Sequence, residues 1–186
     1  MPRSPELDVM LSPARAWRRL AKTPATGNWV AGPLFVAFTL GCAVSLITSG
    51  RLSLRLVLGG TLCGSFVPIL ELASLAIVCR GVLPWRRAAE LFFIGHGPWT
   101  LWLAGSALLW SLFPAPEMYR DDYSWRLSAI PVALWSAYID FWFFREVSRR
   151  AAVRRLIAQR LICWVPGLLI FVAPAGWQTV ASTLGI

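Results

Sequence analysis

Three ionisable residues interrupt long apolar stretches of the chain: Glu71, His96 and Asp140. One imidazole and two carboxylates are ligand types that a divalent metal accepts, and such a group can also pass a proton or bind an ion. The chain contains no H-E-x-x-H motif, no second histidine and no nucleophile beside a base. We therefore rank a structural polar cluster above a transport site and both above a catalytic site. We predict no enzymatic activity, no bound metal and no cofactor.

The three residues are predicted to lie at similar depth in a membrane. Counted from the nearest flanking charge at 1.5 Å per helical residue, Glu71, His96 and Asp140 are about 14, 9 and 8 Å from the inner boundary. A lone charge at the bilayer centre costs about 2.5–3.5 kcal/mol on insertion scales, so pairing His96 with a carboxylate would lower that cost. Asp140 has a second interpretation, as a side chain that reaches toward water near Arg145.

The segment FFIGHGPWTLW, residues 92–102, predicts a kink around His96. Pro98 cannot donate a hydrogen bond to the carbonyl four residues earlier, and a glycine on each side of His96 loosens the same turn. The freed carbonyl groups would attract a protonated side chain. We therefore expect the three ionisable residues to gather around a kinked helix.

Composition and hydropathy identify the elements that carry these residues. Of 186 residues, 57% are hydrophobic and 15% are charged, against about a quarter charged in soluble domains. Five apolar stretches approach or exceed the roughly 18–20 residues that cross a bilayer, where only a helix satisfies its own backbone. These predicted spans are residues 29–49, 56–79, 91–113, 127–144 and 161–181.

The predicted fold class is therefore all-α: a polytopic membrane helix bundle with five transmembrane helices and amphipathic helices on the inner surface. Residues 1–28 form a cytoplasmic amphipathic segment, and residues 29–186 form the transmembrane domain. The formal net charge of +9 does not indicate nucleic-acid binding, because the basic residues alternate with apolar stretches instead of forming one patch.

The distribution of basic residues predicts the orientation. Fourteen of the 18 lysine and arginine residues fall before the first span or in the second and fourth connections, and four fall on the other side. The positive-inside rule then places the amino terminus in the cytoplasm and the carboxyl terminus outside. No cleavable signal peptide is visible, so the first span would direct insertion. The preference for arginine over lysine suggests a bacterial protein, which places it in the cytoplasmic (inner) membrane.

Two amphipathic stretches, residues 12–22 and 148–160, suit helices that lie on the inner surface. In the first, Trp17 would face the bilayer. Each basic residue near an anionic leaflet adds about 1 kcal/mol of attraction, which favours binding to anionic lipids or to an acidic partner. The alternative, which we prefer, is a topology signal with ordinary anchoring. The candidate binding residues are Arg15, Arg18, Arg19, Arg149, Arg150, Arg154 and Arg155.

The glycines and cysteines of the apolar stretches are predicted to have a role in helix packing and none in catalysis. Gly60 and Gly64 form a G-x-x-x-G motif that allows close approach of another helix, either within the chain or from another subunit. The four cysteines form no C-x-x-C pair, and we expect reduced, buried thiols.

The order of these features resembles the bacterial branch of the Yip1 family. The stretch SPARAWRRLAKTP matches its cytoplasmic pattern of proline, aromatic residue, basic pair, leucine and proline, here Pro13, Trp17, Arg18, Arg19, Leu20 and Pro24. The stretch LPWRRAAELFFIGHGPW resembles its polar connection before a third span that contains proline, here Pro98. The three ionisable residues are not part of this pattern. The resemblance implies a non-enzymatic integral membrane protein with five spans. Eukaryotic members of the family are linked to vesicle traffic and small GTPases, and some bacterial members accompany transporters.

The sequence thus predicts a non-catalytic accessory or scaffold subunit of a larger membrane complex, which packs through its helices and a basic cytoplasmic surface. Its partners would be anionic lipids of the inner leaflet and other integral membrane subunits or further copies of itself. The alternative is a small ion- or proton-coupled transporter that uses Glu71, His96 and Asp140.

Overall fold

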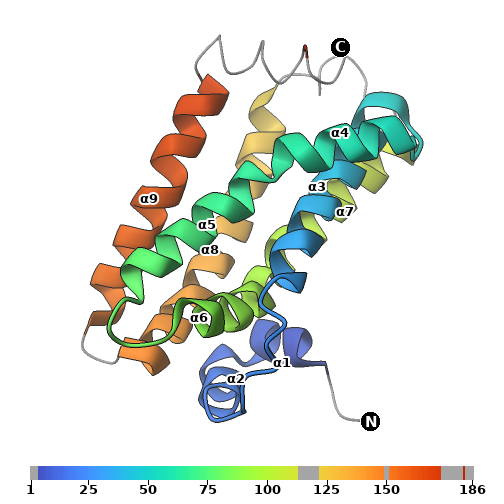
Figure 1. Ribbon diagram of the computed structural model, residues 1–186. Coiled ribbons are helices and arrows are strands. Elements are labelled where there is room, and N and C mark those ends of the chain that lie inside the picture. Colours follow the sequence, from blue (N-terminus) through green and yellow to red (C-terminus); the bar gives the residue numbers. More distant parts are fainter. Residues whose placement is uncertain (1–3, 113–121, 149–150, 173–181, 183–186) are drawn as a thin grey trace.

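The computed structural model describes residues 4–112, 122–148, 151–172 and 182, and within these residues every regular element is helical. The elements are α1 (Pro5–Leu11), α2 (Pro13–Leu20), α3 (Ala31–Ser49), α4 (Leu54–Gly64), α5 (Phe66–Val78), α6 (Trp85–Phe92), the 3-10 helix η1 (Phe93–His96), α7 (Gly97–Leu112), α8 (Asp122–Ser148) and α9 (Ala152–Val172). The long helices form a bundle, and α1, α2 and α6 lie at one end of it (Figure 1). The predicted all-α fold is confirmed for the described residues.

Among the residues that the structure describes, three stretches are long and apolar enough to cross a membrane: Ala31–Ser49, Leu54–Val78 and Leu127–Ser148. They correspond to the first, second and fourth predicted spans. The second consists of α4 and α5, which are interrupted at Ser65. Pro68 explains the interruption, because it has no backbone N–H to donate to the carbonyl of Gly64.

The other two predicted spans are not confirmed as long apolar helices among the described residues. In the stretch 91–113, an α-helix begins at Gly97 and is described over 16 residues, after the turn η1. This irregularity falls where the sequence predicts a kink, since Pro98 cannot complete the preceding α-helical turn. The stretch 161–181 is described only to Val172, as the second half of α9.

The prediction of a separate surface helix over residues 148–160 is wrong. From Ala152 onward this segment is the first half of α9 and continues into the last predicted span without a break. The reason is that one side of this segment is not a water-facing surface. Ala152, Gln159 and Cys163, which share a helix face, are buried.

The buried core lies toward the end of the bundle where α1, α2 and α6 are found. Trp17, Phe92 and Phe143 are at most 2% exposed and meet edge-to-face, with ring centroids 5.4 Å apart for Trp17–Phe143 and 5.6 Å apart for Phe92–Phe143. Elsewhere, many large apolar side chains point away from the bundle. Leu62 is 74% exposed and Leu134 is 67% exposed. An apolar exterior around a small buried core is what lipid-facing helices require.

The expected position of Trp17 on the bilayer surface is also wrong. Its indole N–H donates to the carbonyl of Ile139 at 3.1 Å, and its ring packs on Phe143, so α2 rests on α8. The apolar side of α2 is therefore covered by protein, while Arg15, Arg18 and Arg19 remain exposed on its other side.

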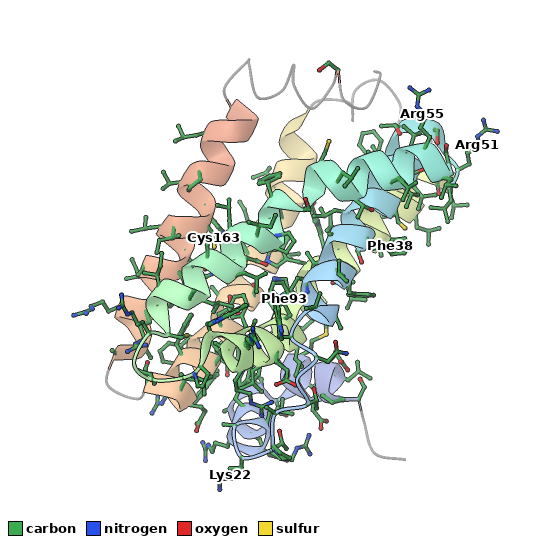
Figure 2. The ribbon with its side chains drawn as sticks, in the orientation of Figure 1. Lys22, Phe38, Arg51, Arg55, Phe93 and Cys163 are labelled. Carbon is green, nitrogen blue, oxygen red and sulfur yellow. The ribbon has the colours of Figure 1, made fainter. Side chains whose placement is uncertain are left out.

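The two ends of the bundle carry different basic residues. Lys22 lies at the end formed by α1, α2 and α6, whereas Arg51 and Arg55 lie at the opposite end (Figure 2). The assignment of these residues to opposite sides of a membrane stays a prediction from the sequence.

Candidate functional site: a cluster of buried ion pairs

Glu71 and His96 form the first pair of the cluster. Glu71 is on α5 and His96 ends η1, and the Nε2 atom of His96 lies 2.9 Å from both carboxylate oxygens of Glu71. The two side chains are 12% and 11% exposed. The ring of His96 also stacks on Phe93, with centroids 4.7 Å apart. The predicted pairing of His96 with a carboxylate is present in the structure, and the 3-10 turn is the element that directs His96 toward α5.

Asp140 and Arg160 form the second pair, between α8 and α9. An Nη2 hydrogen of Arg160 is donated to Oδ2 of Asp140, and Nη2 also lies 3.0 Å from the hydroxyl of Ser136. Asp140 is only 5% exposed at its side chain, so it does not reach toward water near Arg145. The interpretation of Asp140 as a side chain that reaches toward water is therefore wrong.

Sequence patterns did not single out Arg160, which was counted among the basic residues of the fourth connection. A usable signal was present, because Asp140 and Arg160 lie equally far from position 150, between α8 and α9. Antiparallel helices joined by a short connection bring such positions to the same level. The same reasoning did not fix which face of each helix is turned inward.

Gly95 connects the two pairs. A Cβ atom at this position would lie 3.8 Å from Oδ1 of Asp140, 3.1 Å from Ile139 and 3.5 Å from the indole of Trp17. The absence of a side chain thus lets η1 approach α8 and α2 and places His96 beside the second pair. The structure brings Glu71, His96 and Asp140 into one region, as the sequence predicts.

A further set of polar groups extends the cluster between α5 and α9. The Cys163 thiol lies 3.3 Å from the Ser74 hydroxyl, which donates to the carbonyl of Glu71 at 2.7 Å. The amide nitrogen of the fully buried Gln159 lies 3.4 Å from the same sulfur. Sequence analysis did not identify Ser74 or Gln159 as part of a site.

Three buried polar atoms of this region have no hydrogen-bond partner among the described residues: Nδ1 of His96, Oε1 of Gln159 and Nε of Arg160. Buried polar atoms usually bond to protein or to ordered water, so these atoms offer unused hydrogen-bonding capacity. The cluster therefore combines two closed ion pairs with three polar atoms that could bond to a small polar molecule.

The described residues contain no group of three or more His, Cys, Asp and Glu side chains that could hold a metal ion. Cys79 and Cys163 are buried and Cys42 and Cys63 are half-buried, all as free thiols. The metal interpretation of the cluster gains no support from this geometry.

The predicted basic surface is not uniform. Arg18 pairs with Glu146 at 3.3 Å, Arg19 pairs with Asp8, and Arg154 is exposed. Arg155 instead turns inward and donates to the carbonyl of Val78, which ties α9 to the end of α5. Arg149 and Arg150 lie outside the described residues.

A polar clamp between α6 and the segment after α2 was not identified from the sequence. Arg87 donates to the carbonyls of Leu20 at 3.0 Å and Thr23 at 2.6 Å, while Glu90 accepts from the backbone N–H of Thr26 at 2.7 Å and pairs with Arg87 at 2.8 Å. Burial opposes ionisation of Glu90, but hydrogen bonds from Thr26 and Arg87 and the Arg87 charge outweigh it and lower its pKa. The clamp holds the amino-terminal segment on the bundle.

The G-x-x-x-G motif packs within the chain. A Cβ atom at Gly60 would lie 3.0 Å from Cα of Gly41, and one at Gly64 would lie 3.0 Å from Cβ of Leu40. Both neighbours belong to α3, so the motif closes the α3–α4 hairpin. Of the two alternatives that the sequence left open, these glycines take the internal one.

Comparisons of the chain with protein-family models, with curated proteins and with solved structures found no match. The resemblance to the Yip1 family therefore stays a prediction from the sequence motifs.

Proposed function

We propose that this protein is a five-span membrane protein that acts by association, as an accessory or scaffold subunit of a larger membrane complex. It lies in the bacterial cytoplasmic membrane with its amino terminus inside and its carboxyl terminus outside. The three helices long and apolar enough to span support the membrane assignment. In the proposal, α7 and the second half of α9 supply the remaining spans.

The observation that carries the non-catalytic proposal is the internal neutralisation of the cluster. Both carboxylates of the cluster are bound to a basic side chain of the same chain: Glu71 to His96, and Asp140 to Arg160. Buried charges are tolerated when they are paired and hydrogen-bonded, and such pairs can hold helices in one arrangement. A cluster whose charges satisfy one another suits a rigid core better than a site that must accept and release an ion.

The proposed mechanism is therefore packing. The cluster and the aromatic core fix the inner face of the bundle, which leaves outward apolar side chains to contact lipid or partner helices. Exposed leucines on three helices provide such a surface: Leu62 on α4, Leu101 on α7 and Leu134 on α8. The family resemblance supports the same role, because it implies a non-enzymatic integral protein.

The accessory-subunit proposal is tested by mild-detergent purification from the native host. We expect another integral membrane protein to co-purify at fixed stoichiometry. An Arg160→Ala variant, which leaves Asp140 unpaired, should lower that recovery, whereas the exposed control Lys22→Gln should not. Recovery of a partner-free chain from several mild detergents would contradict the proposal.

A second candidate function is a small proton- or ion-coupled transporter. The unpaired atoms Nδ1 of His96, Oε1 of Gln159 and Nε of Arg160 favour it, because they adjoin the ion pairs and could continue a hydrogen-bonded path. Reconstituted vesicles discriminate between the two functions. Under the transporter proposal, Glu71→Gln, His96→Ala and Asp140→Asn lower proton or ion flux. Under the scaffold proposal the wild-type protein shows no flux above empty vesicles.

A further inference from the structure

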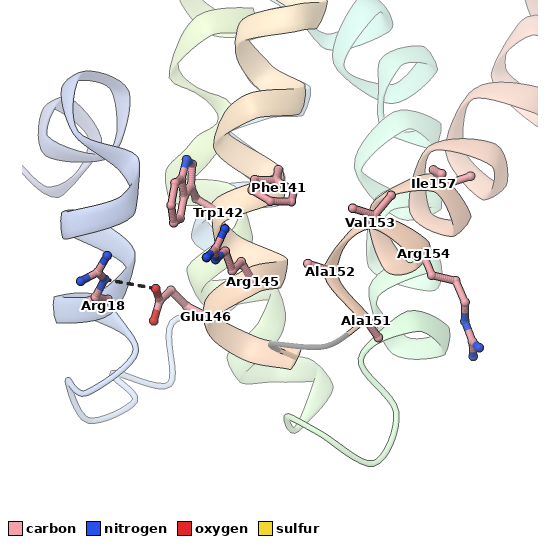
Figure 3. Close-up of a pocket in the computed structure, with 10 residues that line it drawn as sticks. All are labelled: Arg18, Phe141, Trp142, Arg145, Glu146, Ala151, Ala152, Val153, Arg154 and Ile157. Atoms are coloured by element: carbon pink, nitrogen blue, oxygen red, sulfur yellow. Dashed lines mark ion pairs between the residues drawn. The ribbon is translucent and has the colours of Figure 1, made fainter.

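An open-sided pocket of about 940 Å³ lies where α2, the end of α8 and the start of α9 meet. Figure 3 shows Arg18 on α2, Trp142 and Arg145 on α8, and Val153 and Ile157 on α9 around it. The pocket is separate from the cluster of ion pairs, whose four charged residues do not line it. Its volume falls in the range of about 300–1,000 Å³ that is typical of small-molecule sites.

The polar part of the pocket has an uncompensated positive charge. Arg18 and Glu146 neutralise each other through their 3.3 Å ion pair, which is drawn in Figure 3. Arg145 has no carboxylate partner among the described residues, and its guanidinium lies 4.9 Å from the ring centroid of Trp142 and 6.0 Å from that of Phe141. A guanidinium held against aromatic rings keeps its planar set of donors free for a phosphate group.

The other part of the pocket is apolar and continues along the bundle. Val153 and Ile157 are 57% and 54% exposed, and Leu161, one helical turn further along the same face of α9, is 57% exposed. On α8, Tyr138 precedes Phe141 by three residues and is 52% exposed. The pocket thus has a cationic part near the turn between α8 and α9 and an apolar track that leads away along the helices.

We propose that this pocket binds one anionic phospholipid, with its headgroup phosphate on Arg145 and an acyl chain along Ile157 and Leu161. The inference rests on the proposed membrane assignment, because the pocket meets lipid headgroups only if this end of the bundle lies at a membrane surface. A free phosphate would use the arginine but not the apolar track. An acidic peptide would match the charge but not a track of lipid-exposed side chains.

The test uses the full chain in nanodiscs of phosphatidylcholine containing phosphatidylglycerol. The protein is re-extracted in mild detergent, and the retained phosphatidylglycerol per chain is measured by mass spectrometry. We expect Arg145→Gln to lower retention about tenfold, as the loss of a charge-assisted hydrogen bond predicts. Lys22→Gln removes one positive charge from an exposed position outside the pocket, at the same end of the bundle, and is expected to change retention less than about twofold. Arg145→Lys should fall between these values.

The apolar track is tested separately. Ile157→Ser, at an exposed position, is expected to lower retention about threefold or more, because it removes apolar contacts of the acyl chain. Millimolar inorganic phosphate should leave retention unchanged. If Arg145→Gln fails to fold, as judged by thermal unfolding in phosphatidylcholine, the Ile157→Ser result decides the proposal.

Three outcomes would contradict the proposal that the pocket binds an anionic phospholipid. Equal losses for Arg145→Gln and Lys22→Gln would show only general attraction to an anionic leaflet. Displacement of the lipid by inorganic phosphate would show an anion site without a lipid track, and displacement by an acidic peptide would show a protein-docking site. Each of these leaves the proposed function intact. Release of the wild-type chain from membranes by carbonate washing would instead contradict the proposed integral membrane protein.

Discussion

The α3–α4 hairpin and the α8–α9 hairpin differ in what lies between their helices. Between α3 and α4, Gly41 and Gly60 bring the two backbones together, and a Cβ atom at Gly60 would lie 3.0 Å from Cα of Gly41. Between α8 and α9, Asp140 meets Arg160 and Arg160 contacts Ser136. Lipid is as apolar as leucine, so burial of apolar surface does not favour helix association there, and close packing or polar pairing must do so.

The glycine contact and the ion pair are disrupted by opposite kinds of substitution. A glycine contact fails when atoms are added, and an ion pair fails when one charge is removed. The α8–α9 pair also adjoins η1 through Gly95, so its loss should affect several helices. We therefore expect the ion-paired hairpin to be the more sensitive of the two.

Removal of one charge from the α8–α9 pair should give the largest effect. Asp140→Ala leaves Arg160 buried without its partner, and we expect a loss of about 3–5 kcal/mol in the free energy of unfolding. Titration with a denaturing detergent measures it. The double variant Asp140→Leu/Arg160→Met should recover most of the loss, because an apolar pair carries no desolvation penalty. A single-variant loss below about 1 kcal/mol would remove the distinction between the hairpins.

Addition of a methyl group to the α3–α4 contact should give the next effect. Gly41→Ala would place Cβ against Thr61 and the carbonyl of Val57, with the Thr61 nitrogen 2.8 Å away. We expect a loss of about 1–3 kcal/mol from overpacking, measured by the same titration. Gly105→Ala is the matched control, since nothing lies within 4 Å of its Cβ position. It should be neutral or stabilise α7 by up to about 1 kcal/mol. Similar losses at both glycines would mean that close approach is not what Gly41 provides.

The contact between α2 and α8 extends the comparison to a hydrogen bond outside both hairpins. Trp17→Phe keeps an aromatic ring beside Phe143 but leaves the Ile139 carbonyl without its indole donor. We expect about 0.5–1.5 kcal/mol of lost docking free energy, seen as faster proteolysis of residues 21–28. Arg15→Gln, on the exposed side of α2, should leave the cleavage rate unchanged. If the cleavage rate of Trp17→Phe were unchanged, the packing of the aromatic ring alone would account for the docking of α2 on α8.

The clamp at α6 should give the smallest effect, and one that depends on pH. The pKa of Glu90 is lower in the folded protein than its ordinary value, so the clamp stabilises fully above the ordinary glutamate pKa of about 4.3. This contribution is lost as the pH falls through the lower folded-state pKa. Hydrogen exchange at the Thr26 amide should therefore accelerate below about pH 4 beyond its intrinsic trend. Glu90→Gln should show part of this acceleration at neutral pH and little further dependence, and equal pH profiles would contradict the role of the carboxylate.

Much of the fold follows from local patterns in the sequence. Apolar length identified the helices that carry Glu71 and Asp140, and the missing N–H of Pro98 predicted the irregular turn at His96. The pairing of His96 with a carboxylate was also expected, because an unpaired charge is costly in hydrocarbon. The helices and the turn depend on residues close together in the chain, so periodicity and composition are sufficient to find them. The pairing joins residues 25 positions apart, and the sequence indicated only that a carboxylate should be the partner.

The errors arise at contacts between distant segments. Trp17 has the pattern of a membrane-facing residue, yet it is buried against α8, because an amphipathic helix can cover its apolar side with protein as well as with lipid. Arg155 belongs to a basic run, yet it turns inward to the carbonyl of Val78. A pattern of apolar and basic residues does not show whether a side chain contacts lipid, water or another part of the protein.

The sequence by itself determined that this chain is helical and that long stretches of it are apolar enough for a membrane. Each of these properties is a sum over neighbouring residues. Only the tertiary structure decided that Asp140 pairs with Arg160 and that Gly60 packs on Gly41. Such pairings depend on the rotation of each helix about its axis. In a helix with apolar residues on all sides, hydrophobicity does not set that rotation, so the few polar and small residues must do so through contacts with other helices.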